Sequence, residues 1–421
     1  MPERIRDTAG DRGREPKIES DSLRVPEKKL SIFVHRASEC LTDHESHGDG
    51  LICFSLLNGL AERGHQIYAY ANTAPIRECS PNLHIKTATH RVPANSLAPW
   101  EHAWRAKRWM RELEKTTKID LVWRMHPYGE GGPCPPQALG KPLVIGPLFY
   151  AWPEQESNST KTGQPRFGFG LQSLVGPIAK RGWQETLSSA HTVFCATQMH
   201  TEALQKQFPQ VRILELPVIV DPPPGLAARV GLADSKRVTL LFVANLVPNK
   251  NPLVFCETIL HLRSAGIHAT GIVLGDGPER KRLEEYCAAQ DLTSSICFRG
   301  KVANSEVYGM LREADFLISA SLGEPYGRGI AEAMSVGTPA VCHRSGGPAD
   351  FIEDGQNGLL VDELTATAFA GRIQQAIGEQ DQWRQLSSNA LSSASNWQRD
   401  VVLSALEKAL YMASLAGPRE N

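Results

Sequence analysis

The amino-acid sequence predicts an α/β protein built from two doubly wound parallel sheets. Its 421 residues are too many for one hydrophobic core, which favours two domains. Short apolar runs typical of strands alternate with segments of helical periodicity along the chain. The proline-rich stretch "DPPPG" at 221–225 interrupts this alternation, which then starts again. The break argues against one large sheet or a TIM barrel.

The first series opens with a strand, a loop, a helix and a second strand. We expect the opening strand at 29–35 ("KLSIFVH") and the helix at 51–64, where apolar residues follow helical spacing and Gly64 is a suitable C-cap. The next strand is expected at 66–71 ("QIYAYA"). Further strands are predicted at 119–126, 142–146, 190–197 and 212–217, with a helix at 198–208.

The second series repeats the same alternation after the proline break. Strands are predicted at 237–246, 268–275, 295–300, 315–321 and 338–343. Helices are predicted at 251–266, 278–290, 304–314, 328–337, 366–378 and 396–417. Two such series imply two Rossmann-like lobes that face each other across a cleft, and ligands bind at the carboxyl ends of their strands.

Composition excludes several classes of protein. Lys plus Arg (45) nearly equals Asp plus Glu (46), so the whole chain has no electrostatic basis for binding nucleic acid. The nine cysteines form no CxxC pair and lie mostly in apolar runs, as in a reduced cytoplasmic protein. Residues 1–28 are charged and lack the apolar core of a signal peptide, so we expect a disordered tail there. No apolar run approaches the ~18 residues of a membrane span.

The stretch "SLGEPYGRGIAEAMSVG" (321–337) carries two glutamates, Glu324 and Glu332, across a glycine-rich helix start. The amides from Gly327 to Gly329 would be free N–H groups at the helix end, which favour a phosphate. Glu332, about one turn into the helix, suits the hydroxyls of a ribose, and Glu324 can accept hydrogen bonds from a second sugar. Together they suit a nucleotide-diphosphate-sugar. The alternative is that Glu332 caps its own helix and Glu324 is merely solvated.

This stretch resembles the E-x7-E signature of retaining glycosyltransferases of family GT4, which have the GT-B fold. The resemblance extends over most of residues 29–417 and is specific in the second lobe and loose in the first. It is carried by 323–361 and by "VLGDGPERKRLE", "FRGKVANSEVYGMLREADFLISAS", "LLNGLAERGHQIYAYA" and "FCATQMHTEAL". It implies a first lobe at 29–220 on the acceptor side, a donor lobe at 221–395, and a terminal helix at 396–417 that returns to the first lobe.

The resemblance also implies roles for individual residues. In the family, the first glutamate holds the donor sugar and the second binds the ribose, which here are Glu324 and Glu332. The family's G-R-L-x-x-x-K pattern supplies an arginine and a lysine to the phosphates. The corresponding "ANLVPNK" keeps the lysine as Lys250 but has Asn245 in place of the arginine. Arg328 is a candidate to supply the missing charge, unless its side chain points to solvent.

In the first lobe, His126 ends a predicted strand, where members of the family often carry a histidine beside the transferred sugar. A lone histidine is otherwise more often structural. Gly48 and Gly50, in the loop "TDHESHGDGL", can bring backbone close to the donor phosphate or to the acceptor. His44 and His47 lie beside them without a dependable metal geometry, so we expect no metal.

The segment 98–115 is predicted to be a helix with two different faces. Ala103, Ala106, Met110 and Leu113 share one face, whereas Trp100 and Trp104 lie among Lys107, Arg108, Arg111 and Lys115. Aromatic and basic residues together can touch an anionic membrane surface. More often, such tryptophans pack beneath a loop with stacked arginines.

The resulting expectation is a cytoplasmic, retaining glycosyltransferase, with peripheral membrane contact as an alternative. It would move a hexosyl group from a nucleotide-diphosphate-sugar, with a UDP-sugar favoured, to a hydroxyl acceptor, without a cofactor. The expected catalytic residues are Glu324, His126 and Lys250, and the remaining candidates would bind the donor. Two alternatives stay open: a nucleotide-sugar-binding sensor, which the departure at Asn245 favours, and a phosphorylase or epimerase on the same fold.

Overall fold

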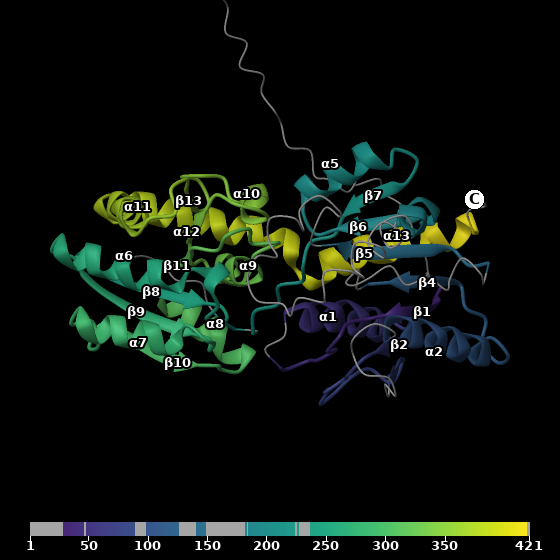
Figure 1. The fold of residues 1–421 in the computed structure, drawn as a ribbon. Coiled ribbons are helices and arrows are strands. Elements are labelled where there is room, and N and C mark those ends of the chain that lie inside the picture. Colours follow the sequence, from purple (N-terminus) through teal and green to yellow (C-terminus); the bar gives the residue numbers. More distant parts are fainter. Residues whose placement is uncertain are drawn as a thin grey trace, which may run out of the picture.

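The computed structural model describes residues 28–45, 48–88, 98–125, 140–148, 182, 184–223, 225–226 and 236–418. Two sheets form two lobes, purple to teal and green in Figure 1. The first sheet has the order β3-β2-β1-β4-β5-β6-β7 and the second β10-β9-β8-β11-β12-β13, and neighbouring strands pair in parallel. The prediction of two doubly wound parallel sheets is confirmed.

The strands have these bounds: β1 Ser31–Arg36, β2 Gln66–Ala71, β3 Leu83–Thr87, β4 Leu121–Arg124, β5 Leu143–Leu148, β6 Thr192–Cys195, β7 Arg212–Glu215, β8 Arg237–Val243, β9 His268–Leu274, β10 Ile296–Gly300, β11 Phe316–Ser319, β12 Ala340–His343 and β13 Leu359–Val361. The helices have these bounds: α1 Gly48–Glu62, α2 Ala98–Leu113, α5 Gln198–Gln207, α6 Pro252–Ser264, α7 Arg280–Ala289, α8 Asn304–Glu313, α9 Arg328–Ser335, α10 Pro348–Phe351, α11 Ala366–Gly378, α12 Gln380–Ala394 and α13 Arg399–Ala416. Two short 3₁₀ turns cover Pro248–Lys250 and Ser395–Trp397.

Helices cover both faces of each sheet. In the first lobe, α1 and α13 pack on one face and α2 and α5 on the other. In the second lobe, α6, α7 and α11 cover one face, and α8 and α9 cover the other. The buried side chains of α1 and α13 belong to the same continuous cluster as those of α8 and α9, so one hydrophobic core runs through both lobes.

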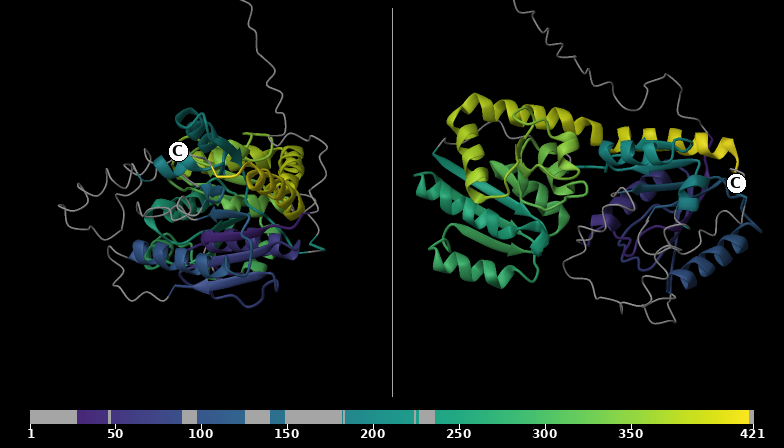
Figure 2. Two further views of the ribbon diagram at one scale, coloured as in Figure 1. Left: turned by 90° about the vertical axis from the view of Figure 1, so that its right-hand side faces the viewer. Right: turned by 45° about the horizontal axis from the view of Figure 1, so that its top comes forward.

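The chain passes between the lobes twice, and the two passages touch. The first passage leads from β7 through the linker at 216–226, and the second leads from α12 through the 3₁₀ turn into α13 (Figure 2). Val220 donates its N–H to the carbonyl of Trp397 at 3.0 Å, which ties the passages together.

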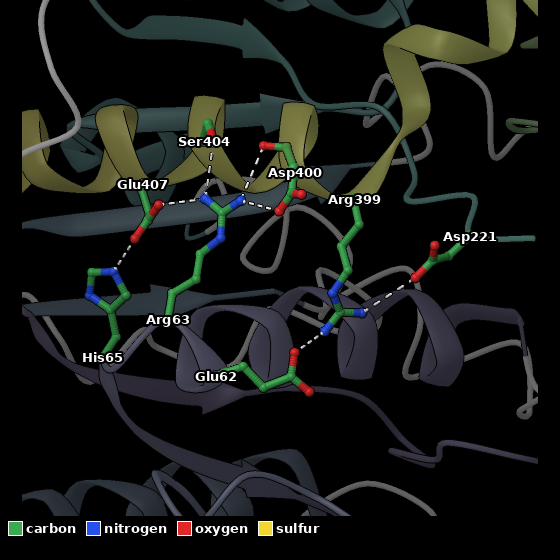
Figure 3. A network of polar contacts seen from close by, with 8 residues as sticks. All are labelled: Glu62, Arg63, His65, Asp221, Arg399, Asp400, Ser404 and Glu407. Atoms are coloured by element: carbon green, nitrogen blue, oxygen red, sulfur yellow. Dashed lines mark hydrogen bonds and ion pairs between the residues drawn. The ribbon is translucent and has the colours of Figure 1, made fainter. Parts of the chain in front are cut away.

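The terminal helix α13 is fixed to the first lobe by close packing and by a polar network. A Cβ on Gly59 of α1 would lie 2.6 Å from a terminal methyl group of Leu403 of α13, so Leu403 would have to move to accommodate a side chain there. Figure 3 shows the network: Arg63 lies 2.6 Å from Glu407, and the Nε2 atom of His65 lies 2.7 Å from the same carboxylate. The Leu30 amide donates to Nδ1 of His65 at 3.1 Å, so Nε2 carries the hydrogen and donates to Glu407.

A second cation links α13 to the linker. Arg399 forms an ion pair with Glu62 of α1 at 2.5 Å, and its other nitrogen lies 3.9 Å from Asp221 (Figure 3). Because Glu407 is only 5% exposed, removing its charged partner Arg63 should destabilise the fold more than breaking the exposed contacts of this network.

Candidate active site

Glu324 is fixed by its backbone in the loop between β11 and α9. The Gly347 amide donates to the carbonyl of Glu324 at 2.8 Å, and Gly346 pairs with Glu324 as an isolated bridge. Gly346 has a φ of +66°, and a Cβ on it would lie 2.2 Å from the Glu324 oxygen. The glycine pair in the loop after β12 therefore allows the backbone contact that positions Glu324. The sequence expectation did not include these two glycines.

Lys250 faces Glu324 from the 3₁₀ turn that follows the neighbouring strand, β8. Its Nζ lies 2.5 Å from Oε2 of Glu324, and the two side chains are 22% and 17% exposed. The turn that carries Lys250 is tied to the Glu324 loop, because Leu322 donates its N–H to the Asn249 carbonyl at 2.8 Å. Asn251 also donates its side-chain amide to the Ala320 carbonyl at 3.1 Å. The two loops thus form one unit at the carboxyl ends of β8 and β11.

Glu332 pairs with Arg328 in the first turns of α9. Nε of Arg328 lies 2.8 Å from Oε1 of Glu332, and the Glu332 side chain is 5% exposed. Tyr308 of α8 is buried near this pair, and its pKa is raised, first by burial and then by the negative charge of Glu332. Nη1 of Arg328 is buried and has no hydrogen-bond partner within the part of the chain that the structure describes. The guanidinium therefore has a donor to spare for an anion.

The helix start has the geometry that the sequence predicts. Gly327 precedes α9 with a φ of +92°, and a Cβ there would lie 2.8 Å from Ile330. Ile330 and Ala331 both donate to the Gly327 carbonyl, so the amides of Arg328 and Gly329 precede these first helical donors. Gly329 lies against the end of β8, where a Cβ added to it would lie 3.6 Å from the backbone oxygen of Val243.

Asn245 is exposed directly after β8, on a segment that the loop after β9 holds in place. A Cβ on Gly275 would lie 1.9 Å from the Ala244 oxygen, and one on Gly277 would lie 2.4 Å from the Leu246 oxygen. Leu246 also donates its N–H to the Asp276 carbonyl at 3.0 Å. Asn245, Lys250 and the α9 start therefore all adjoin the carboxyl ends of β8 and β11.

The first-lobe candidates give a mixed outcome. His126 lies outside the described residues, as does His47. Gly48 and Gly50 lie in the first turn of α1, three residues before the predicted start, so their placement in the preceding loop was wrong. A Cβ on Gly48 meets no atom within 4 Å, so sterics do not require glycine there. His44 instead contacts Asp43 at 2.6 Å.

No group of three or more His, Cys, Asp or Glu side chains suited to a metal ion occurs among the described residues. Likewise, none of the helices described is long and apolar enough to cross a membrane.

On α2, Ala103, Ala106 and Met110, which the sequence places on one face, are buried. Trp104 is 61% exposed, and the guanidinium of Arg108 lies over its ring at 5.9 Å.

Comparison with solved structures defines the class of fold. Sucrose-phosphate synthase from Thermosynechococcus elongatus matches with a TM-score of 0.69 at 15% identity, over 92% of this chain and 100% of that one. HepE from Anabaena, solved with UDP and glucose, matches with a TM-score of 0.62 at 16% identity, over 91% and 99%. These likenesses show the GT-B fold.

The sequence comparisons give the family. Residues 227–392 match the model of the family described as "Glycosyl transferases group 1", and this region contains every second-lobe candidate. The second lobe therefore matches the group 1 glycosyl transferases, in agreement with its GT4-type sequence pattern.

Named relatives agree with this assignment. Alpha-D-kanosaminyltransferase of Streptomyces kanamyceticus is 22% identical over 67% of this chain and 75% of its own. N-acetyl-alpha-D-glucosaminyl L-malate synthase of Bacillus anthracis is 21% identical over 86% and 93%. The lipopolysaccharide core biosynthesis glycosyltransferase LpsE of Rhizobium meliloti is 36% identical, but over only 25% of this chain and 31% of its own.

Proposed function

We propose that the protein is a retaining glycosyltransferase that moves a hexosyl group from a nucleotide-diphosphate-sugar to a hydroxyl acceptor. The observation that carries this proposal is the Lys250–Glu324 pair at 2.5 Å, which places a cation and a carboxylate together at the strand ends. A cation there suits a departing diphosphate, and a carboxylate suits sugar hydroxyls. UDP is the favoured nucleotide, since proteins of the same fold were solved with UDP and glucose and with UDP and GlcNAc.

Arg328 and Glu332 form a second pair, which suits the nucleotide part of the donor. Glu332 would accept hydrogen bonds from the ribose hydroxyls, and the amides at Gly327 and Gly329 would donate to the diphosphate. Arg328 would donate to the same phosphates through its unpaired Nη1 group. This donor would compensate for the positive charge that is lost where Asn245 replaces the family's arginine. Glu332 holds Arg328 at 2.8 Å, so the same carboxylate would also orient this guanidinium.

The chemistry needs charge stabilisation rather than a protein nucleophile. The bond between the anomeric carbon and the diphosphate oxygen breaks, and the acceptor oxygen bonds to the same face of the sugar. The proton of the acceptor hydroxyl passes to the leaving phosphate. Lys250 and the amides at the start of α9 would stabilise the charge that develops on the diphosphate. In this scheme His126, Gly48 and Gly50 would contact the donor from the first lobe, and no metal would take part.

A two-stage assay tests the proposal. Thermal shift against a panel of nucleotide sugars identifies the donor, because a ligand stabilises the fold according to its affinity. The product is then followed by NMR of its anomeric proton, with and without EDTA. Retained configuration and EDTA-resistant activity are expected. An inverted product would refute the retaining mechanism, and activity restored only by Mn²⁺ would refute the metal-free one.

A nucleotide-sugar sensor is the second candidate, and the exposed Asn245 in place of the family's arginine favours it. It predicts binding of a nucleotide sugar with no transfer and no slow hydrolysis. A phosphorylase would instead require inorganic phosphate for turnover, and an epimerase would convert the donor without any acceptor.

A further inference from the structure

The loop that carries Glu324 is held by a side chain as well as by backbone contacts. The hydroxyl of Ser345, two residues after β12, reaches the segment that follows β11. Its Oγ donates to the Ser321 carbonyl at 3.0 Å and accepts from the Gly323 amide at 3.2 Å. One hydroxyl therefore joins both ends of the three-residue segment that leads into Glu324.

His343, the last residue of β12, completes the hydrogen bonding of this hydroxyl. Its Nδ1 atom lies 3.1 Å from Oγ of Ser345 and 3.4 Å from the Ser321 carbonyl oxygen. A carbonyl oxygen can only accept, and the one hydroxyl hydrogen of Ser345 already points to it, so Nδ1 carries its own hydrogen and donates. A hydroxyl has one donor and two acceptor sites. All three are used here, which fixes the orientation of the Ser345 hydroxyl.

The segment before Glu324 has little side-chain packing to hold it. Gly323 has a φ of +70°, and a Cβ on it would meet no atom within 4 Å. The neighbouring Leu322 side chain is 55% exposed. Hydrogen bonds, rather than packing, therefore determine the path of the backbone into Glu324.

We propose that Ser345 is a positioning residue for the reaction: its hydroxyl fixes the backbone before Glu324 and so the place of the Glu324 carboxylate beside Lys250. This inference rests on the proposed function, because it assigns a further residue to the site of that reaction. The carboxylate lies 2.5 Å from Lys250, and a displacement of about 1 Å near reacting atoms can lower a rate about 100-fold. The hydroxyl of Ser345 contacts backbone atoms and His343, so its effect should reach the reaction through Glu324.

A double-mutant cycle tests this route, with release of nucleoside diphosphate from the donor as the assay. Ser345→Ala should lower kcat about 10- to 100-fold in the wild type but less than about threefold in Glu324→Gln, because residues that act through one group are not additive. The KM for the donor should stay within about threefold, since only the placement of a reacting group changes.

Ser414→Ala is the matched control and should leave kcat unchanged. Ser414 is also half-buried and also donates to a backbone carbonyl, that of Tyr411 at 2.7 Å, but it lies on α13. Recovery of kcat in Ser345→Thr, which keeps a hydroxyl, would support the proposal. A near-normal kcat in Ser345→Ala, or an equal loss in the wild-type and Glu324→Gln backgrounds, overturns it.

Amide hydrogen exchange gives a second test that does not depend on activity. In Ser345→Ala the Gly323 amide loses its acceptor and should exchange about 10-fold faster. The Gly271 amide, which donates to the Ser295 carbonyl at 2.8 Å within the second sheet, should exchange as in the wild type. Unchanged exchange at Gly323 would show that Ser345 does not hold the loop, and it would leave the proposed function intact. Faster exchange in a protein that neither transfers nor hydrolyses any donor would instead refute the proposed function, and with it a role for Ser345 in that reaction.

Discussion

Lys250 and Glu324, separated by more than seventy positions in the chain, are brought within 2.5 Å of each other at the carboxyl ends of adjacent strands. Two backbone-anchored loops hold them there, one tied through Asn249 and Leu322 and the other through Glu324 and Gly347. The pair is therefore positioned by the fold before any ligand binds, which limits the reorganisation that the reaction would require.

Removal of the Lys250 ammonium group tests its role toward the leaving group. Lys250→Ala should lower turnover by at least ~100-fold, comparable to loss of one oxyanion-hole donor. Lys281→Ala is the control, because Lys281 is 86% exposed on α7, away from the pair. Steady-state rates of both variants measure the contribution of Lys250 to turnover. Near-normal turnover in Lys250→Ala would show that the phosphates bind elsewhere.

Gly346 tests the backbone contact behind Glu324. Gly346→Ala should reduce both stability and activity, because its Cβ would lie 2.2 Å from the Glu324 oxygen. Gly355→Ala is the matched control: it also has positive φ, +75°, but its Cβ would meet nothing within 4 Å. That control should cost only about 1–2 kcal/mol of backbone strain and leave activity unchanged. Equal effects of the two substitutions on activity would mean that this contact does not position Glu324.

Arg63 tests the attachment of α13 to the first lobe. Arg63→Ala should lower the free energy of unfolding by about 3–5 kcal/mol, because it leaves the buried Glu407 carboxylate without its charged partner. Asp400→Ala removes the other charged partner of Arg63, a carboxylate that is 93% exposed, and should cost only about 0–1 kcal/mol. Urea unfolding of both variants measures the difference. Similar losses in the two variants would contradict the importance assigned to Glu407.

The lowered pKa of His35 predicts that the protein loses stability in mild acid. Its pKa in the folded protein is lowered well below 6.5 by burial and by Arg124, His102 and Arg36. As the pH falls, His35 is therefore protonated in the unfolded chain before it is protonated in the folded protein. Its contribution to the free energy of unfolding is complete above pH ~6.5 and is lost as the pH falls toward the pKa of the folded state. His35→Gln should show a shallower fall in the free energy of unfolding between pH 7 and 5. Some slope should remain, because burial also lowers the pKa of His200, against the opposing charge of Asp350. An unchanged slope would contradict the prediction.

Most of the regular elements could be predicted from sequence because their apolar runs match one period. The elements that were missed lack such a run. β3, "LHIKT", is an edge strand with one buried residue, and β13 has only three residues. α12 contains several Ser residues and an Asn, which have weaker helix propensity, and it is held by the buried Trp383 and Leu386.

The sequence named the candidate site residues one by one, but not the contacts between them. The spacing of Glu324 and Glu332 pointed to both carboxylates, and "ANLVPNK" pointed to Lys250. That Lys250 contacts Glu324 depends on hydrogen bonds between loops far apart in sequence, which no local pattern reveals. The same holds for Gly346, whose need for positive φ arises from tertiary contact with Glu324.

The proposed reaction depends most on Glu324, and one assay tests the role of this residue directly. Release of free nucleoside diphosphate from the nucleotide sugars that the protein binds should be compared for the wild type and Glu324→Gln, a substitution of nearly equal shape. We predict release by the wild type with at least one donor, and a loss of ~100-fold or more in Glu324→Gln, which should still bind the diphosphate within a few-fold of the wild type. Equal release by both proteins would contradict the central claim.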